Sequence, residues 1–161
     1  KEASGTGNMK LMMNGAITLA TLDGANIEIF DQVGEDNIVI FGLSANEVLN
    51  YNKFGGYSAL DLYNSNRVIK RVVDDLVNGF IPNMEKEGRQ IYDSLITYND
   101  EYFVLRDMEN YIEAQEKIDR LYKNKEKWNE MALINIANSG VFSSDRTIAE
   151  YAEDIWFKGC E

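Results

Sequence analysis

Apolar residues follow two different spacings along this chain. Near the start, two short and continuous apolar runs at 17–21 and 37–42 enclose a helix-compatible stretch at 25–32. Continuous runs of this length are typical of strands buried on both faces, and the strand, helix, strand order predicts a parallel βαβ unit with a right-handed crossover. A helix from Thr6 to about Asn14 precedes them, and we expect its Met9, Met12 and Met13 to pack in the core.

After residue 44 the apolar residues recur at helical spacing, and no further strand is expected. Ser44 and Glu47 predict a capping box for a helix that reaches about residue 50. Residues 57–64 and 89–96 are also predicted to be helical. Between them, Ser65 or Asn66 is expected to cap a longer helix that ends at Gly79, with a core stripe made of Val68, Ile69, Val72, Val73, Leu76 and Val77.

Three further helices are expected in the last third, and we interpret their apolar stripes as core rather than as ligand platforms. Ser144 is the expected cap of the third helix. The faces consist of Met108, Tyr111, Ile112, Gln115, Ile118, Leu121 and Tyr122, then Trp128, Met131, Ala132 and Ile136, and finally Ile148, Tyr151, Ala152, Ile155 and Trp156. The fold class predicted from these patterns is α/β and dominated by helices.

Composition narrows the class of function. The 161 residues are 45% apolar, which suits one compact domain at most, and no repeat or linker divides them. A net charge of −11 argues against a nucleic-acid partner. One cysteine, Cys160, and no histidine exclude an intrachain disulfide, a zinc finger and Ser-His or Cys-His catalysis, and we expect no metal site. No apolar run is long enough to span a membrane, so a soluble, cytoplasmic protein is expected.

The first ten residues carry the candidate chemistry. Gly5 and Gly7 stand at the start of the first predicted helix, where backbone N–H groups and the helix dipole favour an anion such as a phosphate. Lys10 follows Thr6 by four residues, so its amine lies on the same helical face. A phosphorylated aldehyde suits this pairing, and pyridoxal phosphate is the simplest such cofactor. The alternative is an ordinary helix start with Thr6 as cap and Lys10 in solvent.

The full string E-A-S-G-T-G-N-M-K-L-M-M-N resembles the cofactor-attachment segment of the glycogen (α-1,4-glucan) phosphorylases. The resemblance continues through A-I-T-L-A-T-L-D-G-A-N-I-E-I and through residues 138–149, so it covers the chain nearly from end to end. It implies that Lys10 holds pyridoxal 5'-phosphate covalently and that Thr6 and Gly7 hold the cofactor phosphate. It also implies that Glu2, with the segment Ala3, Ser4 and Gly5, binds hydroxyls of the glucosyl unit.

The resemblance further implies the reaction and the place of this chain in a larger protein. Inorganic phosphate would cleave terminal α-1,4 bonds of glycogen or maltodextrin to give glucose 1-phosphate. The chain would be the C-terminal portion of the pyridoxal-phosphate-binding, Rossmann-like lobe of a two-lobed (GT-B) glycosyltransferase. The N-terminal lobe and the basic residues for substrate phosphate would lie before Lys1.

We therefore expect the 161 residues alone to be inactive and the full-length protein to be a homodimer. The uncovered strands would favour self-association of the chain by strand edges or by exchange of helix 144–156. Two other classes compete with this interpretation. One is a non-catalytic, acidic, helical interaction domain, and the other is a nucleotide-phosphate site. The second ranks last because the Walker pattern is absent.

Overall fold

The computed structural model describes residues 5–158, and these residues form two compact units. The first, here called the site unit, comprises the chain up to Ile40 and from Glu116 onward, and the second, the helical unit, is Phe41–Gln115. Each unit is described by itself. The site unit contains α1 (Thr6–Met13), β1 (Leu19–Ala20), α2 (Ala25–Val33), a 3-10 turn (Glu35–Asn37), β2 (Val39–Ile40), α8 (Lys125–Asn138), a second 3-10 turn (Ser139–Phe142), α9 (Ser144–Tyr151) and a π-helical turn (Ala152–Trp156).

The helical unit has no strand among the elements that the structure describes. It contains α3 (Ala45–Phe54), α4 (Ala59–Ser65), α5 (Arg67–Asp75), α6 (Glu85–Tyr92) and a π-helical turn (Asp93–Thr97). The longest helix, α7 (Val104–Lys123), begins in the helical unit and ends in the site unit. The predicted helix-dominated α/β class is therefore confirmed, with a sheet of only two strands.

The predicted βαβ unit is present in the site unit. β1 and β2 pair in parallel, with Leu19 opposite Val39 and Ala20 opposite Ile40, and α2 is the connection between them. Both strands are shorter than the apolar runs predicted, because a ladder between two strands forms only where both chains stay extended side by side. The prediction that both strands are buried on both faces is wrong for β1, whose two residues are only half-buried, and holds in β2 only for Val39, because Ile40 is half-buried.

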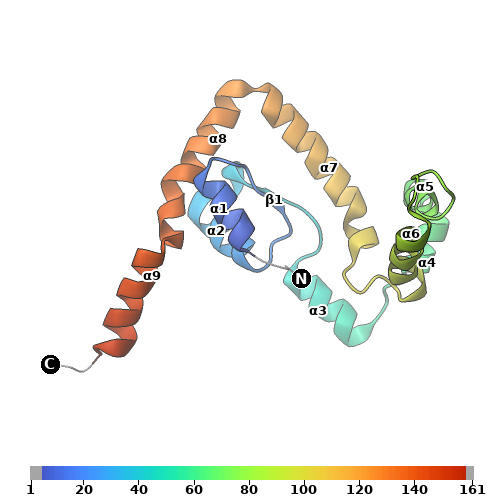
Figure 1. Ribbon diagram of the computed structural model, residues 1–161, viewed down its shortest axis with the longest axis horizontal. Coiled ribbons are helices and arrows are strands. Elements are labelled where there is room, and N and C mark those ends of the chain that lie inside the picture. Colours follow the sequence, from blue (N-terminus) through green and yellow to red (C-terminus); the bar gives the residue numbers. More distant parts are fainter. Residues whose placement is uncertain (1–4, 159–161) are drawn as a thin grey trace. The chain divides into compact units, whose positions relative to one another are not determined.

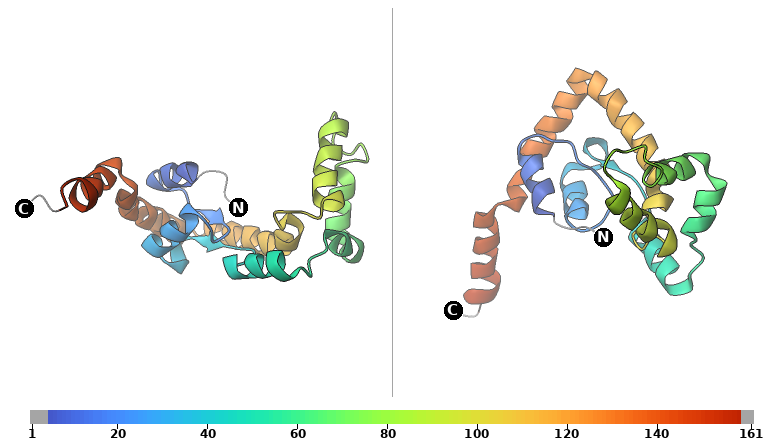
Figure 2. Two further views of the ribbon diagram at one scale, coloured as in Figure 1. Left: turned by 90° about the horizontal axis from the view of Figure 1, so that it is seen from below. Right: turned by 45° about the vertical axis from the view of Figure 1, so that its right-hand side comes forward.

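The core of the site unit lies where α1, α2 and α8 meet beside the sheet (Figures 1 and 2). Its buried apolar side chains are Met12, Ile29, Val33 and Ile38, and Phe30, Ile40, Ile134 and Phe142 pack around them. Of the three methionines predicted to be core, Met12 is buried, Met9 is half-buried and Met13 is exposed. A short helix that packs on one side can bury only one narrow face, which explains the difference.

The helical unit has its own core and a buried carboxylate. Ala59, Ile69, Val73 and Leu105 are its buried apolar residues. Asp100 is only 2% exposed and accepts hydrogen bonds from the backbone N–H groups of Val104 (3.0 Å) and Leu105 (2.7 Å). It also accepts a hydrogen bond from the Tyr57 hydroxyl at 2.7 Å. Asp100 therefore satisfies donors at the start of α7 and joins that helix to the segment before α4.

Local capping signals predict several helix starts correctly. Ser44 and Glu47 form the predicted capping box at α3, and the Asn66 side chain caps α5. At α9 the prediction is wrong by one residue: Ser143, not Ser144, is the cap, because Ser143 has extended backbone and accepts from the Arg146 N–H at 3.2 Å. The helix predicted to end at Gly79 ends at Asp75, and the one predicted for 89–96 begins at Glu85 and passes into a π-helical turn.

The apolar stripes are less buried than predicted. In α5 only Ile69 and Val73 are buried, whereas Val68 and Val72 are exposed. The stripe of the last helix is also exposed, at Ile148, Tyr151, Ile155 and Trp156. Helical periodicity identifies a face that is apolar, but burial also needs another element in contact with that face. Among the described helices, none is long and apolar enough to cross a membrane.

Candidate functional site

The start of α1 has the properties predicted for an anion cradle. The helix begins at Thr6, and Gly5 is the N-cap residue with φ −72° and ψ −16°. No side chain of the described residues caps this end, and no acidic residue lies in the first turn. The alternative in which Thr6 caps the helix is therefore wrong, since Thr6 is the first helical residue. Within the described residues, the first turn therefore supplies no acidic side chain for the positive end of the helix dipole, which favours binding of an external anion.

Thr6 and Lys10 lie on one face of this helix and are both exposed. They are four residues apart, so their side chains are neighbours one turn apart. A Cβ built on Gly7 would meet no atom within 4 Å, so the space beside the first turn is open. The structure thus brings together the three residues predicted to hold the cofactor. Of the predicted sugar-binding residues, Gly5 is the N-cap, while Glu2, Ala3 and Ser4 lie outside the described residues.

The opposite face of α1 is held against the turn between β1 and α2. Asn8 donates from Nδ2 to Oδ1 of Asn26 at 2.7 Å, and Asn26 donates from Nδ2 to the Thr21 carbonyl oxygen at 3.1 Å. Asn26 is only 3% exposed. Neither Asn8 nor Asn26 was predicted from the sequence to be a site residue. The available signal was an asparagine two residues after Gly24, at a strand-to-helix turn where φ of the glycine is +51°.

The turn that carries Asn26 has a fixed conformation of its own. The Thr21 hydroxyl donates to Oδ1 of Asp23 at 2.9 Å, and the Asn26 backbone N–H donates to the Asp23 carbonyl at 3.1 Å. Burial acts to raise the pKa of the Asp23 carboxyl, but hydrogen bonds, including that from Thr21, outweigh it and hold this pKa below its ordinary value. Asp23 is thus charged at neutral pH and remains a good acceptor for Thr21.

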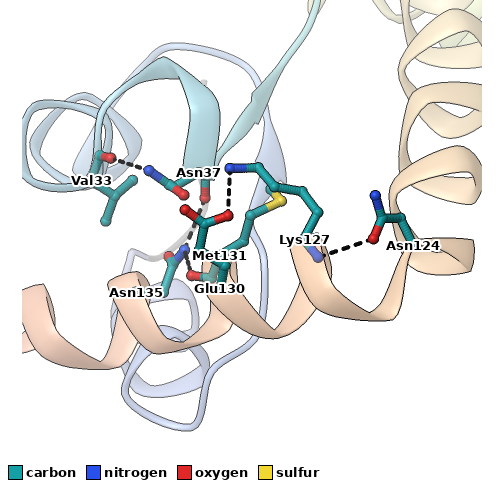
Figure 3. A network of polar contacts seen from close by, with 7 residues as sticks. All are labelled: Val33, Asn37, Asn124, Lys127, Glu130, Met131 and Asn135. Carbon is teal, nitrogen blue, oxygen red and sulfur yellow. Dashed lines mark hydrogen bonds and ion pairs between the residues drawn. The ribbon is translucent and has the colours of Figure 1, made fainter.

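A second pair of buried amides fixes α8 to the end of α2 (Figure 3). Asn135 donates from Nδ2 to the carbonyl oxygens of Asn37 and Met131, both at 2.9 Å, and Asn37 donates to the Val33 carbonyl at 2.8 Å. α8 also packs against α1 and against the segment that follows it, where a Cβ on Gly15 would lie 3.2 Å from Cδ1 of Ile136. The platform behind α1 is therefore tied together by side-chain amides and by tight apolar contact.

The site unit also has an open cavity of about 270 Å³ lined by Phe30, Glu35, Asp36, Ile38, Ile40 and Lys117. None of the predicted cofactor residues lines it, and its two carboxylates would repel a phosphate. It does not replace the α1 cradle as an anion site. Within residues 5–158 no cluster of three or more metal-ligating side chains occurs.

Comparison with known proteins places the chain in a family. A family model for carbohydrate phosphorylases matches residues 1–158, and the chain belongs to this family. It is 56% identical over 156 residues to a glycogen phosphorylase of Bacillus subtilis (strain 168), covering 97% of this chain and 20% of that protein.

Two more relatives have similar coverage. Identity is 48% over 157 residues to a glycogen phosphorylase of Synechocystis, covering 97% of this chain and 18% of that protein. It is 45% over 155 residues to the liver form of human glycogen phosphorylase, covering 96% of this chain and 18% of that protein. The chain therefore spans about a fifth of the length of the curated relatives it matches, and the family resemblance of its sequence is confirmed.

Proposed function

We propose that the longer protein containing this chain cleaves terminal α-1,4-glucosidic bonds of glycogen or maltodextrin with inorganic phosphate to give glucose 1-phosphate. The single observation that carries the proposal is the start of α1, where no described side chain caps the helix and no acidic residue lies in the first turn, with Thr6 and Lys10 exposed on one face. The relatives matched over nearly the whole chain are named glycogen phosphorylases, which supports this substrate class. Pyridoxal 5'-phosphate is the proposed cofactor.

The residues at the start of α1 fit this cofactor. Backbone N–H groups of the first turn and the Thr6 hydroxyl can donate to a phosphate, and Gly7 leaves room for it because no side chain projects there. Lys10 supplies the amine that would bind the aldehyde covalently. When bound, the cofactor supplies a phosphate monoester whose second pKa near 6 lets it accept and donate a proton near neutral pH.

The chain's own residues would then hold the cofactor at both ends and bind the glucosyl unit. Thr6 and Gly7 would hold the cofactor phosphate at the positive end of α1, and Lys10 would hold the aldehyde end of the ring. The cofactor phosphate would therefore keep one position relative to the substrate. Glu2, with the backbone of Ala3, Ser4 and Gly5, would accept hydrogen bonds from sugar hydroxyls, and a carboxylate strengthens these as positive charge develops on the sugar.

The proposal extends to the setting of the chain. We place it in the C-terminal portion of the pyridoxal-phosphate-binding lobe of a two-lobed GT-B glycosyltransferase, in a cytoplasmic protein that forms homodimers. Substrate phosphate and the glucan would be bound mainly by parts of the protein outside these residues. The isolated chain is accordingly predicted to show no phosphorolysis.

The decisive experiment is borohydride reduction of the full-length protein with its cofactor, followed by peptide mapping. Label is expected on Lys10, and Lys10→Ala should abolish covalent retention, whereas Lys53→Ala, at an exposed lysine of α3, should retain it. Thr6→Val should weaken cofactor binding by about 1–3 kcal/mol, the usual cost of losing one hydrogen bond to a charged group. Equal labelling of another lysine in Lys10→Ala would refute the assignment. Failure to take up cofactor at all would favour the non-catalytic interaction domain instead.

A further inference from the structure

Asn8 occupies the face of α1 opposite to the proposed cofactor residues. It lies two residues after Thr6 and two before Lys10, which on an α-helix is about 200° around the axis from each. Its Nδ2 donates to Oδ1 of Asn26 at 2.7 Å. Asn8 therefore contacts the protein behind the helix while Thr6 and Lys10 are presented to the other side.

Asn26 uses both ends of its side-chain amide. Oδ1 accepts from Asn8, and Nδ2 donates to the Thr21 carbonyl oxygen at 3.1 Å, at a position that is 3% exposed. An aspartate there would bring a carboxylate against the Thr21 carbonyl, and a leucine would fill the space without either hydrogen bond. The network uses a donor and an acceptor on one short side chain, which only asparagine provides at this length.

The first turn of α1 needs such a contact. The helix has eight residues, too few to be stable without tertiary contacts, and its only fully buried side chain is Met12. Met12 follows Asn8 by one turn on the same inner face. One apolar anchor allows a short helix to tilt and to rotate about its axis, whereas two anchors a turn apart define both.

We infer that Asn26, acting through Asn8, is a positioning residue that sets the rotation of the first turn of α1, so that Thr6 and Lys10 reach the same phosphorylated aldehyde. The inference rests on the proposed function and deepens it. Neither asparagine touches the cofactor. Their effect is on how well the cradle and the amine are held in register with each other.

The test is binding of pyridoxal 5'-phosphate to the full-length protein after removal of its cofactor, read as the dissociation constant and as the absorption maximum of the bound form. Asn8→Asp keeps the size of the side chain but replaces the donor with an acceptor facing Oδ1 of Asn26. Asn26→Leu keeps the volume and removes both hydrogen bonds. The matched control is Asn37→Ala, which removes a buried amide of the same unit whose one side-chain hydrogen bond within residues 5–158 goes to the Val33 carbonyl.

Asn8→Asp and Asn26→Leu are expected to raise the dissociation constant about five- to tenfold, the effect of one or two lost hydrogen bonds, and to shift the absorption maximum. Asn37→Ala should lower the melting temperature of the protein about as much as the other two variants do. It should leave the dissociation constant of the cofactor within about twofold of the wild-type value. The inference is overturned if all three variants bind alike, or if binding falls only in proportion to melting temperature. Because Asn8 is half-buried, Asn8→Asp decides the matter if Asn26→Leu fails to fold. A wild-type protein that takes up no cofactor refutes the proposed function itself, which the wild-type titration reveals first.

Discussion

The two units have small apolar cores of similar kind, but they bury different polar groups. In the site unit the buried polar side chains include Asn26, Asn37 and Asn135, which hydrogen-bond largely to backbone carbonyls. In the helical unit the corresponding group is a carboxylate, Asp100, which is paired with the Tyr57 hydroxyl and with the start of α7.

The two kinds of buried polar group differ in how they respond to pH. Amides do not titrate, so a platform made from them keeps its hydrogen bonds over the whole range in which proteins fold. A buried carboxylate forms stronger hydrogen bonds, but removing the Asp100 side chain leaves several donors without an acceptor. The Tyr57 hydroxyl that contacts it is itself an ionisable group. We therefore expect the support of the α1 cradle to change little with pH above the acid range in which the Asp23 carboxyl, with its lowered pKa, becomes protonated. At alkaline pH the helical unit is expected to be the more sensitive part, because it contains the buried Tyr57 hydroxyl.

The largest effect is expected for Asp100→Ala in the helical unit. The change removes the acceptor of three hydrogen bonds, two of them at the start of α7, and should lower the free energy of unfolding by about 4 kcal/mol. Urea unfolding gives the size, and peptide-resolved hydrogen exchange shows whether the loss is confined to 41–115.

The control for Asp100→Ala is Asp107→Asn. Burial raises the pKa of the Asp107 carboxyl, so a neutral side chain is tolerated there, and an amide oxygen can still accept from the Leu43 N–H. We expect a change below about 0.5 kcal/mol. If the two variants are equally destabilised, buried charge is not what distinguishes Asp100.

A smaller loss is expected for Asn135→Ala in the site unit. Two hydrogen bonds from Nδ2 are lost, but so is a buried Oδ1 that has no partner in the described part of the chain, and the net cost should be about 2 kcal/mol. This cost should be the same at pH 5.5 and pH 8.5. Asn138→Ala should cost less than half as much, because the Asn138 amide donates to the Ile134 carbonyl one turn back in its own helix. A strong pH dependence of the Asn135 variant would break the comparison between the units.

The smallest effect concerns pH and the Tyr57 hydroxyl. Burial, followed by the hydrogen bond to Asp100, raises the pKa of Tyr57 well above its ordinary value near 10. Because the pKa of Tyr57 is higher in the folded than in the unfolded chain, the hydroxyl contributes fully to the free energy of unfolding below about pH 10. This contribution is lost as the pH rises further, since ionisation of the tyrosine then stabilises the unfolded chain. The urea midpoint should fall between pH 9.5 and 11.5, and Tyr57→Phe should flatten this fall at a cost of about 1 kcal/mol at pH 7. An unchanged slope in Tyr57→Phe would assign the alkaline loss to other groups.

Local signals in the sequence predicted much of the secondary structure. The capping box at Ser44 and Glu47 and the strand, helix, strand order were correct, and Asn66 was one of the two caps predicted for α5. These signals work because a cap or a turn is satisfied by residues three or four positions away. Thr6, Gly7 and Lys10 could be proposed as cradle residues from the sequence for the same reason, since they lie within a single helical turn and a half.

What the sequence determined by itself is therefore local: which segments become helices, where most of them begin, and that Thr6 and Lys10 share a face. Only the tertiary structure decided which apolar faces are covered, because burial depends on an element far away in the chain. It also decided that Asn8 meets Asn26, 18 residues later, and that Gly88 in α6 lies so close to the Leu76 carbonyl that a Cβ would overlap it. The sequence does not distinguish an asparagine or a helical glycine with a structural role from one without such a role. The role depends on the distant backbone against which the residue packs.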